Sequence, residues 1–180
     1  MALDVPMHRD GTTNIWEAVK KGSIPAVKYF CSTNPYNIIK THLTGRDYTA
    51  LHYASEAGHY NIAGFLLNQG ACVDALDSEQ ITPLMKASQH GHHAIVKLLL
   101  NRGAQINQQD RFKRTPLHCA VANNHFSIVE ELIERGANNL IRNQNNQTPL
   151  TWAITCFDEL NRNKIIIYLS NFEFTNAKIE

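Results

Sequence analysis

The sequence lacks the signals of a membrane-embedded or exported protein. None of its apolar runs approaches the roughly 20 residues that a transmembrane helix needs. The first residues, MALDVPMHRDG, do not place a basic stretch before an apolar one, as a secretory signal peptide does. The four cysteines lie at least 37 positions apart and form no CxxC pair. We therefore expect reduced thiols and a cytoplasmic location, with the nucleus, or translocation as an effector, as the alternatives.

An excess of charge of either sign is also missing. The 180 residues include 17 Lys and Arg against 16 Asp and Glu, which gives a formal charge of +1. Nucleic-acid binders normally carry a basic excess, so we predict no nucleic-acid partner, and the short apolar runs predict no membrane partner. Apolar residues make up 43% and charged residues 18%, which is typical of a folded globular chain.

Motifs for catalysis or cofactor binding are absent too. The sequence contains no GxGxxG, no P-loop, no HExxH and no GxSxG. The histidine cluster at 90–93 has no Cys or carboxylate beside it, and a metal site needs three or four convergent ligands. Cys119 follows His118 directly, but consecutive residues of a helix point in different directions. We predict no catalytic residue, metal ligand, cofactor or small-molecule substrate, and therefore no enzyme.

What the sequence does contain is a repeat with a period of 33 residues. Four similar hexapeptides follow one another at that step: TALHYA at 49–54, TPLMKA at 82–87, TPLHCA at 115–120 and TPLTWA at 148–153. Two further markers keep the same step, namely Gly58-His59, Gly91-His92 and Asn124-His125, then Gly70-Ala71, Gly103-Ala104 and Gly136-Ala137. Three markers in one phase indicate an array of structural units.

Each unit predicts a short first helix, and the unit from Asp77 is the clearest. Thr82 suits the N-cap because its hydroxyl accepts a hydrogen bond from the free backbone N–H groups, and Pro83 is tolerated at the first helical position. Gly91 ends the helix, since glycine accepts the left-handed backbone of a helix stop. The packing face consists of Leu84, Ala87 and Ser88.

A second helix follows in each unit, and Gly103 ends the one in this unit. Its apolar stripe is too wide for a lone surface helix, and it comprises Ile95, Val96, Leu98, Leu99 and Leu100. The equivalent sets in the neighbouring units are Ile62, Phe65, Leu66 and Leu67, then Ile128, Val129, Leu132 and Ile133. No unit can bury such a stripe alone, so we expect the stability to come from stacking.

The repeat resembles the ankyrin repeat, whose signature is T-P-L-H-x-A within 33 residues. The resemblance covers roughly residues 12–171 and implies an all-α solenoid of stacked antiparallel helix pairs with hairpin-like loops, about five repeats in all. It also implies that His52 and His118 form hydrogen bonds between adjacent loops.

The repeats predict one ankyrin-repeat domain over residues 1–180. Its units are 12–43, 44–76, 77–109, 110–142 and 143–171, followed by a tail at 172–180. The first and last units depart from the pattern, as terminal units that cap an array do. Residues 34–43 form an exit loop about three residues longer than its counterparts, and residues 157–163 insert about four residues before the last apolar run.

Proteins that resemble this family bind partners in a concave groove, formed by the loop tips and the exposed side of each first helix. Projecting those positions onto the units predicts a partner-binding set of Arg46, Tyr48, Tyr53, Glu79, Ile81, Lys86, His90, Arg111, Phe112, Arg114, Asn123 and Trp152. The set is rich in aromatic residues and arginine, which binding hot spots favour. Scattered exposed apolar residues, with Trp152 packed against the last unit, are the alternative interpretation.

The function that these observations favour is a non-enzymatic adaptor that holds a partner protein in the groove. A local basic cluster, Arg111, Lys113 and Arg114, suggests a partner with an acidic segment, and a solvated run of charge is the competing interpretation. The alternatives are a structural or assembly subunit of a larger complex, and a microbial effector directed at a host protein.

Overall fold

The computed structural model describes residues 9–38, 46–156 and 159–176, and in these ranges all regular structure is helical. The helices are α1 (Ile15–Lys20), α2 (Ile24–Thr33), the short 3-10 helix η1 (Pro35–Ile38), α3 (Ala50–Ala57), α4 (Tyr60–Asn68), α5 (Pro83–Gln89), α6 (His93–Asn101), α7 (Pro116–Ala122), α8 (Phe126–Glu134), α9 (Pro149–Cys156) and α10 (Glu159–Asn176).

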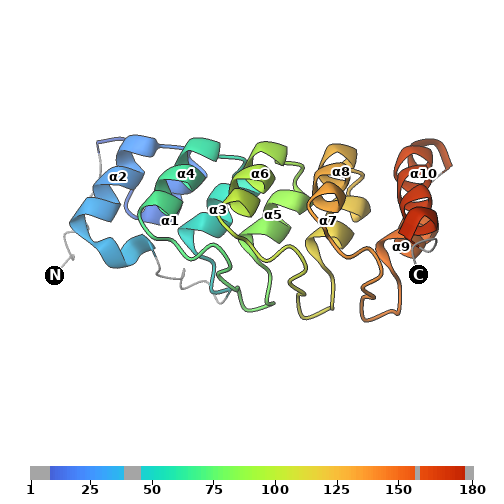
Figure 1. The fold of residues 1–180 in the computed structure, drawn as a ribbon. Helices are drawn as coiled ribbons and strands as arrows, with labels where there is room; N and C mark the ends of the chain where they lie inside the picture. The colour runs from blue at the N-terminus through green and yellow to red at the C-terminus, as the bar shows by residue number, and fades with distance from the viewer. Residues whose placement is uncertain (1–8, 39–45, 157–158, 177–180) are drawn as a thin grey trace.

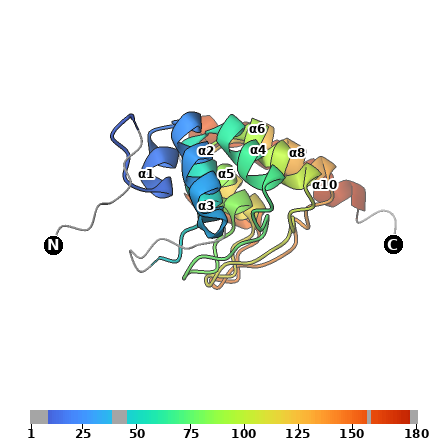
Figure 2. The same ribbon diagram turned by 90° about the vertical axis from the view of Figure 1, so that its left-hand side faces the viewer.

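Consecutive helices pair, and the pairs stack in sequence order into an elongated row (Figure 1). The first helices α1, α3, α5, α7 and α9 contact one another along one layer, and the second helices α2, α4, α6, α8 and α10 form the other layer (Figure 2). The predicted all-α solenoid of stacked helix pairs is confirmed. None of the described helices combines the length and hydropathy needed to cross a membrane.

The threonine of the repeated hexapeptide starts each first helix, as the sequence predicts. The Oγ1 atoms of Thr49, Thr82 and Thr115 accept hydrogen bonds from backbone N–H groups three residues later, at 3.4, 3.2 and 3.4 Å. Thr148 does the same for the N–H of Thr151 at 3.2 Å. Such a cap stabilises a helix by about 1 kcal/mol, so four caps fix where the first helices begin.

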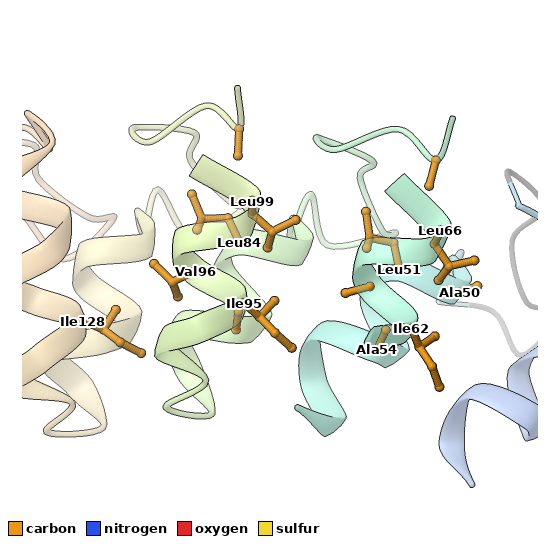
Figure 3. Close-up of a cluster of buried hydrophobic side chains, with 14 of the residues drawn as sticks. Ala50, Leu51, Ala54, Ile62, Leu66, Leu84, Ile95, Val96, Leu99 and Ile128 are labelled. Carbon is orange, nitrogen blue, oxygen red and sulfur yellow. The ribbon is translucent and has the colours of Figure 1, made fainter. Parts of the chain in front are cut away.

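The core runs along the whole row between the two layers, and Figure 3 shows part of it. From each of the second helices α4, α6, α8 and α10 it takes an isoleucine and a leucine that are at most 3% exposed: Ile62 and Leu66, Ile95 and Leu99, Ile128 and Leu132, Ile165 and Leu169. Each first helix contributes an alanine, and Ala54, Ala87 and Ala120 are fully buried. These small side chains let neighbouring helices approach closely, so every unit is buried by the units beside it.

A glycine–histidine contact joins adjacent units at the end of each first helix. The backbone of Gly91 is left-handed (φ 78°). The His125 ring of the next unit packs so closely that a Cβ atom on this glycine would lie only 2.7 Å from a ring carbon. His125 Nε2 bonds to the carbonyl oxygen of Gln89 at 3.1 Å. The same arrangement joins Gly58 to His92 and Gly22 to His59.

The contact explains why one unit departs from the Gly-His pattern. Asn124 replaces the glycine and holds the same left-handed backbone (φ 58°). The sequence has no histidine after His125, so no imidazole of a following unit needs the space beside Asn124. Asparagine tolerates this backbone region better than most side chains, which makes it an acceptable helix stop here.

The two ends differ from their predicted boundaries. Helix α10 continues to Asn176, so residues 172–176 of the predicted tail are helical. Of the predicted insertion at 157–163, residues 159–163 belong to α10, and 157–158 lie outside the described residues. The long exit loop at 34–43 contains η1, and its residues 39–43 lie outside the described residues as well.

We expect Gly91→Ala to destabilise the array more than Gly103→Ala does. Both glycines have a left-handed backbone (φ 78° and 82°), which costs an alanine about 1–2 kcal/mol, but Gly103 has no atom within 4 Å of an added Cβ. Gly91→Ala also displaces the His125 ring and its hydrogen bond, a further cost of about 1 kcal/mol. Urea unfolding of the two variants measures the difference.

A double variant isolates the contact. In a His125→Ala background the ring is gone. Gly91→Ala should then lower the free energy of unfolding about as much as Gly103→Ala does, to within a few tenths of a kcal/mol, because the two substitutions act independently. Equal costs of Gly91→Ala with and without His125 would contradict the role assigned to this pair.

Candidate functional site

The loops before the first helices project together to one side of the row (Figures 1 and 2). We call the surface that they form with the adjoining sides of α3, α5, α7 and α9 the loop face; its loop residues are 46–49, 77–82, 110–115 and 143–148. One side chain stabilises each of the last three loops. Oδ1 of Asp77, Asp110 or Asn143 accepts hydrogen bonds from two backbone N–H groups in its own loop. The loops therefore share one conformation.

Hydrogen bonds between loops hold that conformation in register. The backbone N–H groups of Ser78, Arg111 and Gln144 donate to carbonyl oxygens of the preceding loop, on Arg46, Glu79 and Phe112, at 3.0, 3.0 and 2.9 Å. The loop tips thus form a continuous ladder rather than independent flexible segments. Such a ladder presents side chains at fixed spacing along the face.

Two buried histidines add a second set of bonds between loops, as the sequence resemblance implies. His52 accepts a hydrogen bond at Nδ1 from the Thr49 N–H, so its Nε2–H donates to the carbonyl oxygen of Ile81 at 2.9 Å. His118 bridges Thr115 and the carbonyl oxygen of Gln147 in the same way, at 3.1 Å. Burial lowers the pKa of both imidazoles, because the charged form is poorly solvated there.

The loop face has a hollow of about 470 Å³ near its amino-terminal end, which we call the N-terminal hollow. The rings of Tyr48 and Tyr53 lie 5.1 Å apart at its base. Lys20 Nζ lies 4.5 Å from the centre of the Tyr53 ring, and Lys86 Nζ lies 4.9 Å from that of Tyr48. The complete lining is Lys20, Arg46, Tyr48, Tyr53, Glu56 and Ala57.

A smaller hollow of about 170 Å³, the C-terminal hollow, lies between the last two loops of the same face. It is lined by Phe112, Arg114, Trp152 and residues 143–145. The guanidinium carbon of Arg114 lies 5.0 Å from the centre of the Phe112 ring, and the Trp152 ring lies 5.6 Å from that of His118. Each end of the loop face thus combines aromatic rings with basic groups.

Comparison with known families agrees with this architecture. A family model described as ankyrin repeats (3 copies) matches residues 15–110 and again residues 84–179. The chain belongs to the ankyrin-repeat family. Ankyrin repeats are in general protein–protein interaction modules, and so the surface of the array, rather than a catalytic centre, becomes the site to examine.

The structure places the residues predicted for partner binding at three levels of exposure. Arg46, His90, Arg111 and Asn123 are exposed, and Tyr53, Glu79, Phe112, Arg114 and Trp152 are half-buried. Tyr48, Ile81 and Lys86 are buried, at 3%, 7% and 8% exposure, and for these three the expected exposure is wrong. Two subsets come together: Arg46, Tyr48 and Tyr53 in the N-terminal hollow, and Phe112, Arg114 and Trp152 in the C-terminal hollow.

The three buried residues have a common physical reason. Tyr48 and Ile81 each precede a capping threonine and contact the fourth residue of the first helix in the next ankyrin repeat, which is Lys86 or Cys119. Ile81 forms a small apolar cluster with Met85 and Cys119. Tyr48 lies against the His52 ring and under Lys86. The sequence marks these positions as loop and helix surface, but the next repeat covers them.

The basic cluster predicted around residue 111 is largely neutralised. Arg114 forms an ion pair of 2.6 Å with the buried Asp110, and Arg111 lies 3.6 Å from a carboxylate oxygen of Glu79. Lys113, the third basic residue of the cluster, is exposed and has no ion pair with a described residue, and the same holds for Lys20 and Arg46 beside the N-terminal hollow. Sequence projection missed Lys20. A shift of 36 residues aligns 13–18 of the first repeat with the hexapeptide at 49–54, and the same shift pairs Lys20 with Glu56, another lining residue.

Three histidines of the 90–93 cluster in this ankyrin chain each contact a different group, so their rings do not converge on one site. Nδ1 of His90 contacts the carbonyl oxygen of Lys86, Nε2 of His92 contacts that of Glu56, and Nε2 of His93 contacts the Glu131 carboxylate. Within the described ranges, no three His, Cys, Asp or Glu side chains are grouped so as to hold a metal ion. Burial raises the pKa of the Cys119 thiol to about 12, which makes this cysteine a poor nucleophile at neutral pH.

The buried histidines predict that acid destabilises the array. Because the fold lowers their pKa, the unfolded chain, whose histidine pKa is about 6.5, takes up these protons first. Their contribution is complete above about pH 7.5, begins to be lost as the pH falls below the unfolded-state pKa of about 6.5, and continues to fall until the pH reaches the lower pKa of the folded chain. We expect the urea midpoint to fall over this window.

The substitution pair His52→Met and His118→Met tests the assignment, since Met85 fills the equivalent buried position of the middle repeat. The double variant should lose stability near pH 7.5, by about 1–2 kcal/mol per site for the lost hydrogen bonds, yet change less between about pH 7.5 and 5. A pH slope as steep as that of the unaltered chain would contradict the assignment.

Proposed function

We propose that this ankyrin-repeat protein is a non-enzymatic interaction module that holds a segment of a partner protein against its loop face. The observation that carries the proposal is the pair of aromatic hollows at the two ends of one face, whose loops are locked in register by backbone and histidine hydrogen bonds. A preorganised surface loses little conformational entropy on binding, and aromatic side chains supply large contact area.

An assembly subunit is the second candidate function, and the last repeat favours it. Ile154 and Ile167 are 49% and 58% exposed, whereas Val121, which precedes Ile154 by one repeat, is 1% exposed beneath its neighbour. An apolar end of this kind suits permanent stacking in a larger complex. Light scattering separates the two candidates, because an obligate subunit would self-associate or aggregate when purified alone.

Truncation of the three aromatic residues that are accessible on the loop face tests the adaptor function. We expect Tyr53→Ala, Phe112→Ala and Trp152→Ala together to weaken partner capture at least about 100-fold, since truncated hot spots cost about 2 kcal/mol or more each. The measurement is affinity capture from lysate followed by quantitative mass spectrometry, with circular dichroism to confirm the helical content.

Tyr36→Ala with Tyr60→Ala is the matched control. These tyrosines are 73% and 48% exposed and lie on other helices, so their loss should leave capture intact. If the triple variant, still helical, captures the same proteins at the same level as the unaltered chain, the loop face is not the binding surface.

A further inference from the structure

We propose that the N-terminal hollow is an anchor for an acidic side chain of the bound segment. This proposal rests on the proposed function, because it assigns chemistry to one end of the same loop face. The occupant is an acidic peptide segment, whose carboxylate lies between Lys20 and Arg46 at the rim of the hollow.

The basic residues along the loop face differ in whether they already have a counter-ion. Lys20 and Arg46 are exposed, and neither takes part in an ion pair with a described residue. At the other end, Arg114 and Arg111 already have Asp110 and Glu79 as counter-ions. A partner carboxylate therefore gains most at the N-terminal hollow, where it displaces no internal partner.

The tyrosines hold the ammonium groups in position. Lys20 lies over the Tyr53 ring, and Lys86, only 8% exposed, lies over that of Tyr48. Cation–π contacts orient an ammonium group but do not neutralise it. No described carboxylate pairs with Lys86, so its charge adds to the positive potential at the base of the hollow, where a low dielectric strengthens attraction for an anion.

The acidic residues near the hollow have contacts of their own. Glu56, the carboxylate in its lining, lies 3.9 Å from Nε2 of His90, a contact that is an ion pair only when this imidazole is protonated. Asp77 is buried, and its Oδ1 accepts hydrogen bonds from the N–H groups of Glu79 and Ile81. Neither forms an ion pair with Lys20 or Arg46.

The extent of the positive charge favours a peptide over a nucleic acid. A phosphate backbone is bound by a long track of basic residues, because each neutralised phosphate adds to the affinity. Here the formal charge is +1, and Lys20 and Arg46 are two cations beside one hollow, with the arginines of the opposite end paired. One or two carboxylates of a bound peptide are enough to neutralise Lys20 and Arg46.

Titration with acetylated hexaglutamate, followed by amide NMR at low salt, tests the proposal on the full chain. Shifts should concentrate at residues lining the N-terminal hollow. Lys20→Gln with Arg46→Gln should weaken binding about tenfold, since each exposed ion pair changes affinity several-fold. Lys28→Gln with Arg102→Gln, which removes the same charge from exposed residues of α2 and the end of α6, should change it less than twofold.

Three results would overturn the proposal. The first is that hexaglutamate causes no amide shifts. The second is that the shifts spread over all basic residues and both double variants weaken binding equally. The third is that a short oligothymidylate binds the same residues more tightly than hexaglutamate does. Failure of this anchor is separable from failure of the proposed function, because Phe112→Ala with Trp152→Ala tests partner capture at the C-terminal hollow and leaves Lys20, Arg46 and Tyr53 unaltered.

Discussion

Apolar contact between adjacent helix pairs is the interaction on which the rest of this molecule depends. Ile62, Ile95 and Ile128 are each 1% exposed because a neighbouring pair covers them, and a single pair would leave its stripe in water. The core is therefore elongated and grows with each repeat, which makes neighbour-to-neighbour contact the unit of stability. Helices of only six to ten residues persist in the first four pairs for the same reason.

Polar contacts then set how one pair sits on the next. Apolar stripes tolerate sliding, whereas the contact of His125 with Gly91 and the bond from His118 to the carbonyl oxygen of Gln147 are satisfied in one register. Buried polar groups that lose their partners cost more than apolar groups that shift. These bonds bring all the loops to one side, and the loop face is their consequence.

The chemical character of that face changes at positions where the repeats differ. The fourth residue of the first helix is Tyr53, Lys86, Cys119 or Trp152 in successive repeats, although the backbone there is the same. The aromatic residues at its ends line hollows, whereas Lys86 and Cys119 between them are covered. One scaffold position thus yields two aromatic hollows and a buried strip between them.

The sequence alone determined the period, the capped helix starts, the glycine stops and the apolar stripes, because these depend on residues within one repeat. The tertiary structure decided that Tyr48, Ile81 and Lys86 are buried and that Arg114 is paired, because both outcomes depend on side-chain contacts that residue type and local spacing do not specify. It also placed Lys20, from a degenerate repeat, beside Tyr53. Helix ends follow from local backbone chemistry, whereas exposure and charge pairing follow from how the whole array packs.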